Sequence, residues 1–365
     1  MKHQILKEIP KKAYREIHIQ LVPEKNDTAK TFTEKIAEYL QAYQANPIRA
    51  TFFGTLAEKK NTVRQLETLL TAIDFPVTWI EGDNCTGAFI NGVYILAVSG
   101  IEVQRLYHNS LPVGSAFQTE DADFCYLGGL YSDPDLPPSQ QAENLLNLTE
   151  NILNRLNLSF EDTIRTWFYL DDILDWYGDF NRVRTAFFNK HDIFSKRVPA
   201  STGIEGSNPA GSKASMELTA IKPKNKRFSI ERLRSPLQCS AEDYGSSFSR
   251  AIWFANGDHS YITVSGTASI GPNGNILHTN NLEKQMELTF NVVNEILKSR
   301  NFTFEDVVRA YAYCKDKNYS NAFYDYLKRA GLDEKISFIC SENKVCWEEL
   351  LFEIEVDVAK KNLNV

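Results

Sequence analysis

Apolar and polar residues follow two spacings along this chain, and the two spacings recur in the same order. In two long stretches apolar residues lie near the three- and four-residue spacing of a buried helix face. These residues are Leu145, Leu148, Ile152 and Leu153, and again Leu288, Val292, Ile296 and Leu297. Each predicted helix lies between a β-rich run (124–130 or 261–267) and an alternating strand (163–170 or 307–313). A second helix (180–190 or 319–329) and a closing strand (214–221 or 350–358) follow.

The two stretches are copies of one unit. Residues 159–165 (SFEDTIR) resemble residues 303–309 (TFEDVVR), which lie 144 positions further along the chain. The same offset aligns four more pairs: Gln141 with Gln285, Asn147 with Asn291, Leu153 with Leu297, and Asp172 with Asp316. Several matches at a single offset indicate an internal repeat of one supersecondary unit.

The N-terminal part has no clear match to the repeat, although it shows the same order of elements. Its predicted strands are 17–21, 49–56 and 77–80, and its predicted helices are 31–44 and 61–73. Residues 88–98 predict a hairpin, because Asn91-Gly92 is a favoured two-residue turn.

These elements predict an α+β fold in which helices pack on one face of a mixed sheet in each unit. The polar segment 222–226 marks the boundary between the two repeats. We therefore expect an N-terminal α/β segment at 1–84, a first repeat at 85–225 and a second repeat at 226–365.

Composition and charge exclude several classes of function. The chain has 365 residues, of which 43% are hydrophobic and 24% charged, as in an ordinary globular protein of two or three domains. Its net charge of −7 argues against nucleic-acid binding, which needs clustered Lys and Arg. No stretch is apolar enough to cross a bilayer, and the charged N-terminus lacks the apolar core of a secretory signal. We therefore expect a cytoplasmic protein that does not bind membranes.

The sequence contains no recognisable cofactor motif. Its six cysteines and six histidines are scattered, without a C-x-x-C pair or any cluster with metal-ligand spacing. It has neither a Walker loop nor a Rossmann fingerprint. We expect reduced thiols, no metal and no organic cofactor.

A series of motifs resembles a known family. Residues 246–251 (SSFSRA), 264–266 (VSG) and 352–355 (FEIE) are similar to segments of RidA/YjgF domains. Within that superfamily the chorismatases are a closer match, through six motifs in their own order and spacing. These are 165–169 (RTWFY), 199–205 (PASTGIE), 235–241 (SPLQCSA), 247–251 (SFSRA), 265–270 (SGTASI) and 345–355 (VCWEELLFEIE). The chain thus resembles the chorismatases over about 85–358, which implies tandem RidA/YjgF-like (chorismate-mutase-like) α/β sandwich units.

The resemblance also implies a reaction and a catalytic residue. Chorismatases cleave the enol-pyruvyl ether of chorismate and release pyruvate, which requires a proton donor to the enol carbon and an activated water. The match places the donor at Glu353, between Phe352 and Ile354, because a carboxyl in a partly apolar pocket has a raised pKa. Glu355 shares its strand face. The residues alone leave a second interpretation open, in which both carboxyls face solvent on an edge strand.

Further residues are candidates for binding the substrate. Arg250 suits a carboxylate, Gln238 and Tyr244 lie in a Ser- and Gly-rich loop, and 265–268 offer backbone N–H groups to a ligand oxygen. The full set is Arg250, Gln238, Tyr244, Ser265, Gly266, Thr267, Ala268, Cys340 and Asn321, the last two by alignment with RidA proteins. The alternatives are an exposed Arg, an interdomain linker, a strand bulge, a buried inert thiol and a surface Asn.

The chain departs from the chorismatase pattern at four places. Phe168 replaces an Asn, and Leu237 and Trp347 each replace an Arg. Residues 271–275 (GPNGN) stand in place of a His-containing turn, and the nearest histidine is His278. Because arginine holds carboxylates in a bidentate geometry, these losses leave the substrate open. Phe338 stands where RidA deaminases carry an Arg, which argues against imine hydrolysis.

Three functions follow as hypotheses. The first is a hydrolase or lyase acting on chorismate or a related small carboxylic acid. The others are a RidA-like enamine or imine deaminase and a non-catalytic protein that binds a small acid. RidA proteins are trimers with sites between subunits, so the copies in one chain predict a monomer that imitates the trimer, or a small homo-oligomer.

Overall fold

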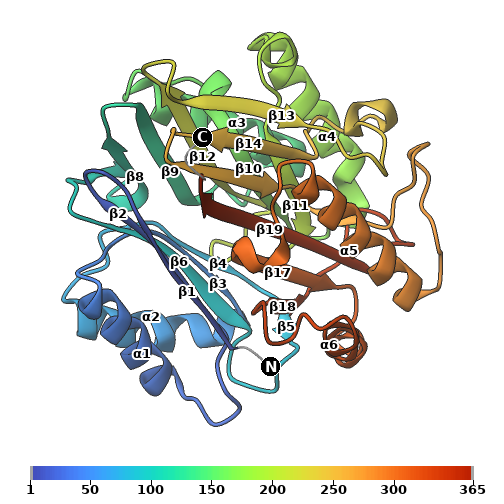
Figure 1. Cartoon of the computed structure of the whole chain (residues 1–365), viewed down its shortest axis with the longest axis horizontal. Helices are drawn as coiled ribbons and strands as arrows, with labels where there is room; N and C mark the ends of the chain where they lie inside the picture. Colours follow the sequence, from blue (N-terminus) through green and yellow to red (C-terminus); the bar gives the residue numbers. More distant parts are fainter. Residues whose placement is uncertain (1–2, 363–365) are drawn as a thin grey trace.

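Three α+β units follow one another in the computed structural model, which describes residues 3–362 (Figure 1). The N-terminal unit contains β1 (Gln4–Pro10), β2 (Arg15–Leu21), α1 (Ala29–Ala42), β3 (Asn46–Phe53), α2 (Leu56–Leu70), β4 (Val77–Ile80) and β6 (Gly92–Ser99). The middle unit contains β7 (Gln104–His108), β8 (Leu111–Gln118), β9 (Ala122–Tyr131), α3 (Pro138–Asn154), β10 (Thr163–Leu170), α4 (Ile173–Lys190), β11 (Ala200–Glu205) and β12 (Ala214–Pro223).

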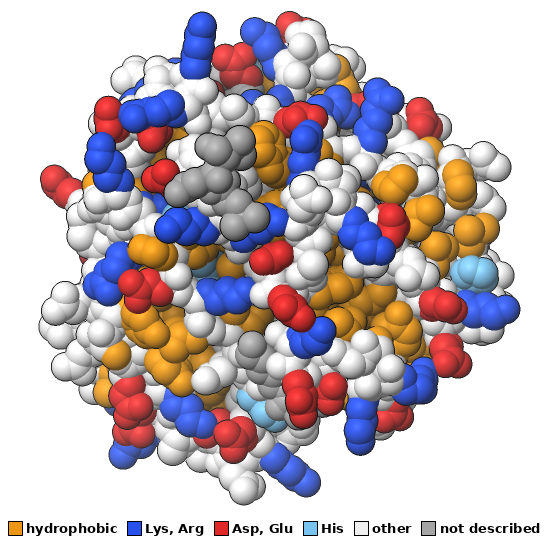
Figure 2. Space-filling view, in the orientation of Figure 1, with side chains coloured by type: hydrophobic (Ala, Val, Ile, Leu, Met, Phe, Trp, Pro, Cys, Tyr) orange, Lys and Arg blue, Asp and Glu red, His pale blue; other side chains and the backbone are white. Residues whose placement is uncertain are grey.

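The C-terminal unit contains β13 (Ser229–Leu233), β14 (Ala251–Ala255), β15 (His259–Val264), β16 (Thr267–Ala268), α5 (Leu282–Lys298), β17 (Val307–Cys314), α6 (Tyr319–Arg329), β18 (Ile339–Glu342) and β19 (Phe352–Lys361). The short strand β5 (Asp83–Asn84) extends its sheet beyond β18. On the face shown in Figure 2, acidic and basic side chains are interspersed.

The three sheets share one topology. Their strand orders are β1-β2-β6-β3-β4, β8-β9-β12-β10-β11 with β7 outside β8, and β14-β15-β19-β17-β18 with β13 outside β14. In each sheet the closing strand (β6, β12 or β19) inserts at the centre, and one parallel pair lies at the end. The α+β class with helices on one face of a mixed sheet is therefore confirmed, and the N-terminal segment is a third copy of the unit.

One expected boundary and one expected hairpin do not match these sheets. β6 is the central strand of the first sheet, so the N-terminal unit runs to Ser99 and the expected boundary between residues 84 and 85 falls inside it. Residues 88–91 form no strand, so Asn91 does not turn a hairpin. Its side chain instead donates to the backbone oxygens of Gly82 and Asp83 at 3.2 and 3.1 Å.

Packing explains why the repeat motifs recur. Gln141 and Gln285 are both buried, and each donates to two carbonyls in flanking loops while accepting from the segment that leads to the closing strand. The accepted bonds come from the backbone N–H of Lys213 at 2.6 Å and of Leu351 at 2.8 Å. Each Phe-Glu-Asp turn is a short 3-10 helix closed by a capping box before β10 or β17.

The sheets face one another at the centre of the molecule and the helices lie outside (Figure 1). Three aromatic residues, Phe53, Tyr169 and Tyr313, hold equivalent positions in the three sheets and pack together in one central core. A threonine hydroxyl accepts an equivalent hydrogen bond at two interfaces, between the N-terminal and middle units and between the middle and C-terminal units. The N–H of Gly129 donates to Thr78 Oγ1 and that of Gly266 to Thr202 Oγ1, each at 2.9 Å.

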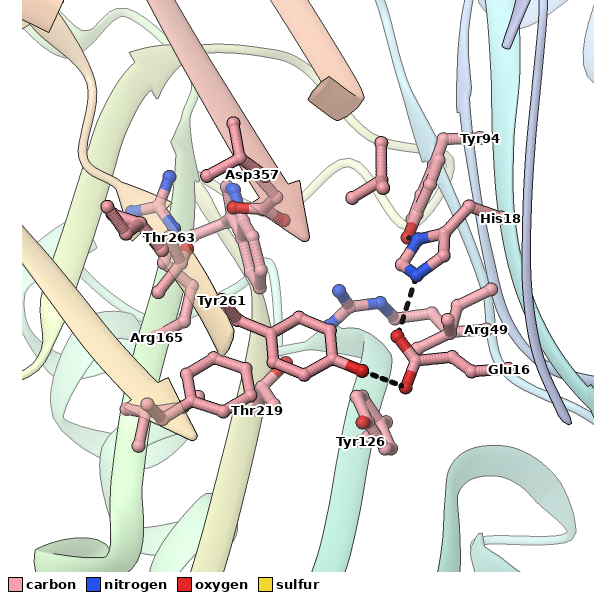
Figure 3. Close-up of a pocket in the computed structure, with 17 residues that line it drawn as sticks. Glu16, His18, Arg49, Tyr94, Tyr126, Arg165, Thr219, Tyr261, Thr263 and Asp357 are labelled. Carbon is pink, nitrogen blue, oxygen red and sulfur yellow. Dashed lines mark hydrogen bonds and ion pairs between the residues drawn. The ribbon is translucent and has the colours of Figure 1, made fainter. Parts of the chain in front are cut away.

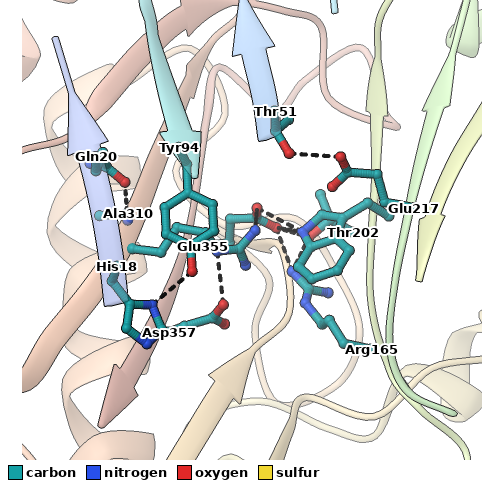
Figure 4. Close-up of polar contacts among 12 residues, drawn as sticks. His18, Gln20, Thr51, Tyr94, Arg165, Thr202, Glu217, Ala310, Glu355 and Asp357 are labelled. Atoms are coloured by element: carbon teal, nitrogen blue, oxygen red, sulfur yellow. Dashed lines mark hydrogen bonds and ion pairs between the residues drawn. The ribbon is translucent and has the colours of Figure 1, made fainter. Parts of the chain in front are cut away.

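Three buried arginines surround the Trp167 ring where the units meet, and we call them the arginine ring. Figure 4 shows Arg165 with its partner Glu355. Arg49, Arg165 and Arg309 each follow a β-bulge in β3, β10 or β17. Arg49 pairs with Glu217 of the middle unit at 3.8 Å, and Arg165 pairs with Glu355 of the C-terminal unit. The residue equivalent to these glutamates in the N-terminal unit is Tyr94, and Arg309 pairs instead with Asp357 of its own sheet at 2.8 Å. Every charge of this ring therefore has a partner, as burial demands.

A cavity of about 60 Å³ lies beside this ring and is lined by all three units (Figure 3). Glu16 accepts hydrogen bonds there from His18 Nε2 at 2.6 Å and from the Tyr261 hydroxyl at 3.2 Å. Burial alone would raise the pKa of Glu16, but these bonds and the Lys11 charge lower it to about 2. Glu16 is therefore a structural anion within the core.

Candidate active site

A small chamber lies between the middle and C-terminal units. It has a volume of about 30 Å³ and receives side chains from α4 and β11 on one side and from the loop 244–250, the β15–β16 turn and β19 on the other. Its lining residues are Tyr177, Arg184, Ser201, Gly203, Tyr244, Ser246, Phe248, Arg250, Gly266, Ala268, Ile270, Cys346, Trp347, Leu350 and Glu353. Five residues predicted from the sequence thus meet here, namely Glu353, Arg250, Tyr244, Gly266 and Ala268.

Glu353 is the acidic residue of the chamber. It lies on β19 opposite Tyr313 and Ala268, and only 5% of its surface is exposed. Within residues 3–362 no group donates a hydrogen bond to its carboxyl. Burial raises the pKa of Glu353 to about 8, and the nearby Glu355 charge adds to the rise, while Arg165 and Arg250 oppose it. The carboxyl therefore keeps its proton at neutral pH.

Gly266 is in close contact with this carboxyl. A Cβ atom built on Gly266 would lie 2.1 Å from Glu353 Oε1 and 3.1 Å from the Thr202 methyl group. Contacts shorter than 3 Å are not tolerated between such atoms, so only glycine leaves the carboxyl its place.

Glu355 shares the strand face but has a different environment. It accepts from Arg165, from Thr202 Oγ1 and from Trp167 Nε1, the last at 2.9 Å (Figure 4). These donors fix it as an anion of the arginine ring. The edge-strand alternative for both carboxyls is wrong, because β19 lies between β15 and β17.

Two arginines face the chamber without an acidic partner. Arg250 donates from Nε to the Cys239 carbonyl at 3.0 Å, and one of its terminal nitrogens has no partner among the described residues. Arg184 donates to Asn181 Oδ1 at 2.6 Å and weakly to Ser201 Oγ at 3.4 Å, and its Nε is likewise unpaired. Both are at most 4% exposed. Two buried cations beside a neutral carboxyl make a site suited to an anion.

The remaining loop candidates support the wall of the chamber. The Gln238 amide donates to the carbonyls of Ala268 and Ile270 at 2.9 and 3.0 Å, which holds the turn after β16. Ser265 Oγ accepts from the Ser201 N–H at 2.8 Å and donates to the Ser249 carbonyl at 2.5 Å. Thr267 Oγ1 donates to the Ser265 carbonyl.

The expected role of the backbone N–H groups is not met at two positions. The N–H of Ser265 donates to the Arg250 carbonyl at 2.9 Å, and that of Gly266 to Thr202, so neither is free for a ligand oxygen. Glycine is needed at 266 for close approach and not for a free donor.

Cys340 and Asn321 lie apart from the chamber. Cys340 points from β18 into the core beneath the helices, where its sulfur lies 3.7 Å from that of Cys314. The alternation of β18 turns its neighbour Ile339 toward the central face, and Cys340 therefore points away from it. Asn321 is exposed on α6. Neither residue lines the chamber.

Three residues that depart from the resembled pattern have separate roles. Phe168 packs on Phe180 in the helix-side core of the middle unit, with ring centroids 4.8 Å apart. Leu237 packs against the helix-side core of the C-terminal unit. Trp347 lies at the mouth of the chamber, edge-to-face with Tyr244 at 5.4 Å.

Sequence reasoning missed Arg184 and Tyr177, which come from α4 of the neighbouring unit. One signal was present, because Arg184 falls on the apolar stripe formed by Phe180, Phe187 and Phe188. A charged residue on such a stripe needs a partner or a function.

An open groove of about 670 Å³ adjoins the chamber. It runs along α4 and shares Tyr177, Tyr244, Ser246, Cys346 and Trp347 with the chamber. These shared residues separate a narrow inner space from a wide outer one.

Only one of the three equivalent interfaces carries the acid. The positions that match Glu353 are Ser215 in β12 and Gly92 in β6, opposite Tyr169 and Phe53. Residues 3–362 hold no group of three His, Cys, Asp or Glu side chains arranged to bind a metal. In the same residues no helix is long and apolar enough to span a membrane.

Comparisons with known proteins agree with this architecture. The family described as Endoribonuclease L-PSP, which comprises RidA/YjgF domains, matches residues 246–360. A crystal structure of a chorismatase superposes with a TM-score of 0.64 at 16% identity, covering 86% of this chain and 92% of that one. The C-terminal unit therefore matches the model of this family, and the whole chain shares the fold of a chorismatase.

Smaller proteins match about a third of the chain. Yeast Mmf1 has 21% identity and a TM-score of 0.30, covering 36% of this chain and all of its own. A member of the YjgF protein family from Neisseria meningitidis has 16% identity and a TM-score of 0.29, covering 37% of this chain and 98% of its own. No curated protein matches the sequence.

Proposed function

We propose that this chain, whose C-terminal unit matches the RidA/YjgF family and which shares the fold of a chorismatase, cleaves the enol-pyruvyl ether of chorismate or of a related small carboxylic acid. Glu353 is the acid and base of the reaction, and Arg250 binds a carboxylate of the substrate. The enol-pyruvyl end enters the inner chamber while the ring remains in the outer groove, because only the groove has room for it.

One observation carries this proposal. Glu353 is a buried carboxyl that no described group hydrogen-bonds, and its pKa is raised to about 8. Two arginines that form no ion pair with any described residue line the same chamber. A neutral carboxylic acid beside two cations can bind an anionic enol ether and protonate it.

The reaction balances with one water. The Glu353 carboxyl gives its proton to the terminal methylene carbon, whose π electrons form the new C–H bond. Water adds to the neighbouring ether carbon and returns a proton to the Glu353 carboxylate. The hemiketal then collapses, its hydroxyl proton passes to the ring oxygen as the C–O bond breaks, and pyruvate and the ring alcohol leave.

The test is pyruvate release from chorismate by purified protein. We expect Glu353→Gln to reduce kcat about 10²–10⁴-fold, because the amide cannot donate the proton. Glu349→Gln is the matched control, since this carboxyl is exposed next to the chamber segment, and it should retain full activity.

Other outcomes would select a different function. No pyruvate, but 2-oxo acid from amino-acid-derived imines, would favour a RidA-like deaminase. Phe338 argues against that outcome, because it packs against Phe290 and Phe323 in the helix-side core. Saturable binding of chorismate without turnover would indicate a non-catalytic acid-binding protein.

A further inference from the structure

We propose that Arg184 of α4 is a specificity-determining residue that holds an anionic group of the ligand directly. The ligand then contacts two units of the fold, with Arg250 on the C-terminal unit and Arg184 on the middle one. This inference rests on the site proposed above, but it does not depend on the reaction that the site performs.

The surroundings of Arg184 hold it in place without neutralising its charge. Its guanidinium lies 5.0 Å from the centroid of the Phe180 ring and 5.9 Å from those of Phe168 and Phe248. Its hydrogen bonds go to the amide of Asn181 and to the hydroxyls of Ser201 and Tyr177, which are all neutral. The side chain is thus pre-oriented by rings, and a donor and a full charge remain for a ligand.

The arginine ring of the same molecule shows what a structural arginine looks like in this fold. Arg49, Arg165 and Arg309 are as buried as Arg184, and each forms an ion pair with a carboxylate. Arg184 and Arg250 form no ion pair with any described residue. A buried charge without a counter-ion destabilises the free protein, and an anionic ligand would supply the missing counter-ion.

Two unpaired arginines on one chamber fit a ligand with two anionic groups better than a ligand with one. A monoacid carries a single negative charge and can neutralise only one of these two cations. The second arginine therefore sets a preference for diacids over monoacids of the same size.

The experiment measures binding by calorimetry, with benzene-1,3-dicarboxylate and benzoate as probes. We expect the wild-type chain to bind the diacid at least ~10-fold more tightly, because each charge-assisted contact contributes at least that factor. Arg184→Met should abolish the preference, and Arg184→Lys should retain part of it. Arg155→Met, an exposed arginine of the same unit, is the control and should leave the preference unchanged.

Thermal unfolding without ligand separates a binding role from a structural one. Arg184→Met removes an unpaired buried charge and keeps the apolar stem, so its Tm should equal or exceed that of wild type. A lower Tm, an intact diacid preference in Arg184→Met, or no diacid preference in wild type would each overturn the inference. A preference that depends on Arg184 in a chain that releases no pyruvate would refute the proposed function and leave this inference standing.

Discussion

At the scale of single residues, two glutamates on one strand face show how environment decides chemistry. Glu355 accepts hydrogen bonds from Arg165, Trp167 and Thr202 and is a fixed anion. Glu353, two positions earlier, has none of these donors and keeps its proton. Alternation in the sequence places both on one face, but only the folded chain shows which donors reach which carboxyl.

The pKa of Glu353 predicts the pH dependence of activity. Its carboxyl must be protonated to act as the acid, so kcat/KM should be level below about pH 8 and fall about tenfold per unit above it. A pH–rate profile of pyruvate release checks this. A rate that falls with a midpoint near 4.5 instead would mean that the pKa of the catalytic carboxyl is not raised, which would contradict the proposed role of buried Glu353.

The same pKa has a consequence for stability with a definite sign. An unfolded Glu ionises near pH 4.3, whereas folded Glu353 stays neutral to about pH 8, so stability is lost as pH rises between these values. Glu353→Gln should therefore be more stable than wild type at pH 8 and not at pH 4, which urea unfolding at the two pH values measures.

Gly266 offers a second residue-level prediction. A methyl group at this position meets the Glu353 carboxyl and the Thr202 side chain, so Gly266→Ala should displace the acid. We expect a loss of activity of tenfold or more together with about 1–3 kcal/mol of stability. Gly211→Ala is the comparison, since open space surrounds that glycine and only its backbone angle opposes the change. Full activity in Gly266→Ala would show that the carboxyl does not need its observed position.

At the scale of elements, the sequence predicted those helices and strands whose apolar residues follow a regular local spacing. The helices α3 and α5 and the strands β10 and β17 follow from apolar spacing and from the repeated Phe-Glu-Asp turn. β6 was assigned to the wrong unit because insertion of a closing strand into the sheet centre depends on contacts between distant segments. Arg184 was missed for a related reason, since α4 belongs to one unit and completes the site of another.

At the scale of the whole molecule, the three units are held together by charges that cross between them. Arg165 of the middle unit and Glu355 of the C-terminal unit are both buried and paired. Asn343 adds an uncharged link, because its amide donates to the carbonyls of Glu81 and Glu205 at 2.9 Å and so joins all three units.

Removal of one partner from the buried pair should weaken the entire assembly. We expect Glu355→Gln to cost about 3–5 kcal/mol, because it leaves Arg165 without its counter-ion. The exposed pair of Glu231 with Arg300 provides the control, and Glu231→Gln should cost at most about 1 kcal/mol. Urea unfolding of the two variants measures the difference, and equal midpoints would show that the ring does not hold the units together.

Ser215 and Gly92 stand where the C-terminal unit has Glu353. The three equivalent interfaces between the units can therefore change independently of one another. In an assembly of identical subunits, any substitution is copied to every interface at once. Here each surface is encoded separately, so two can be kept for cohesion alone while the third alters its ligand preference one residue at a time. Because one polypeptide encodes all three interfaces, the interface with Glu353 can change its residues without weakening the two interfaces that hold the units together.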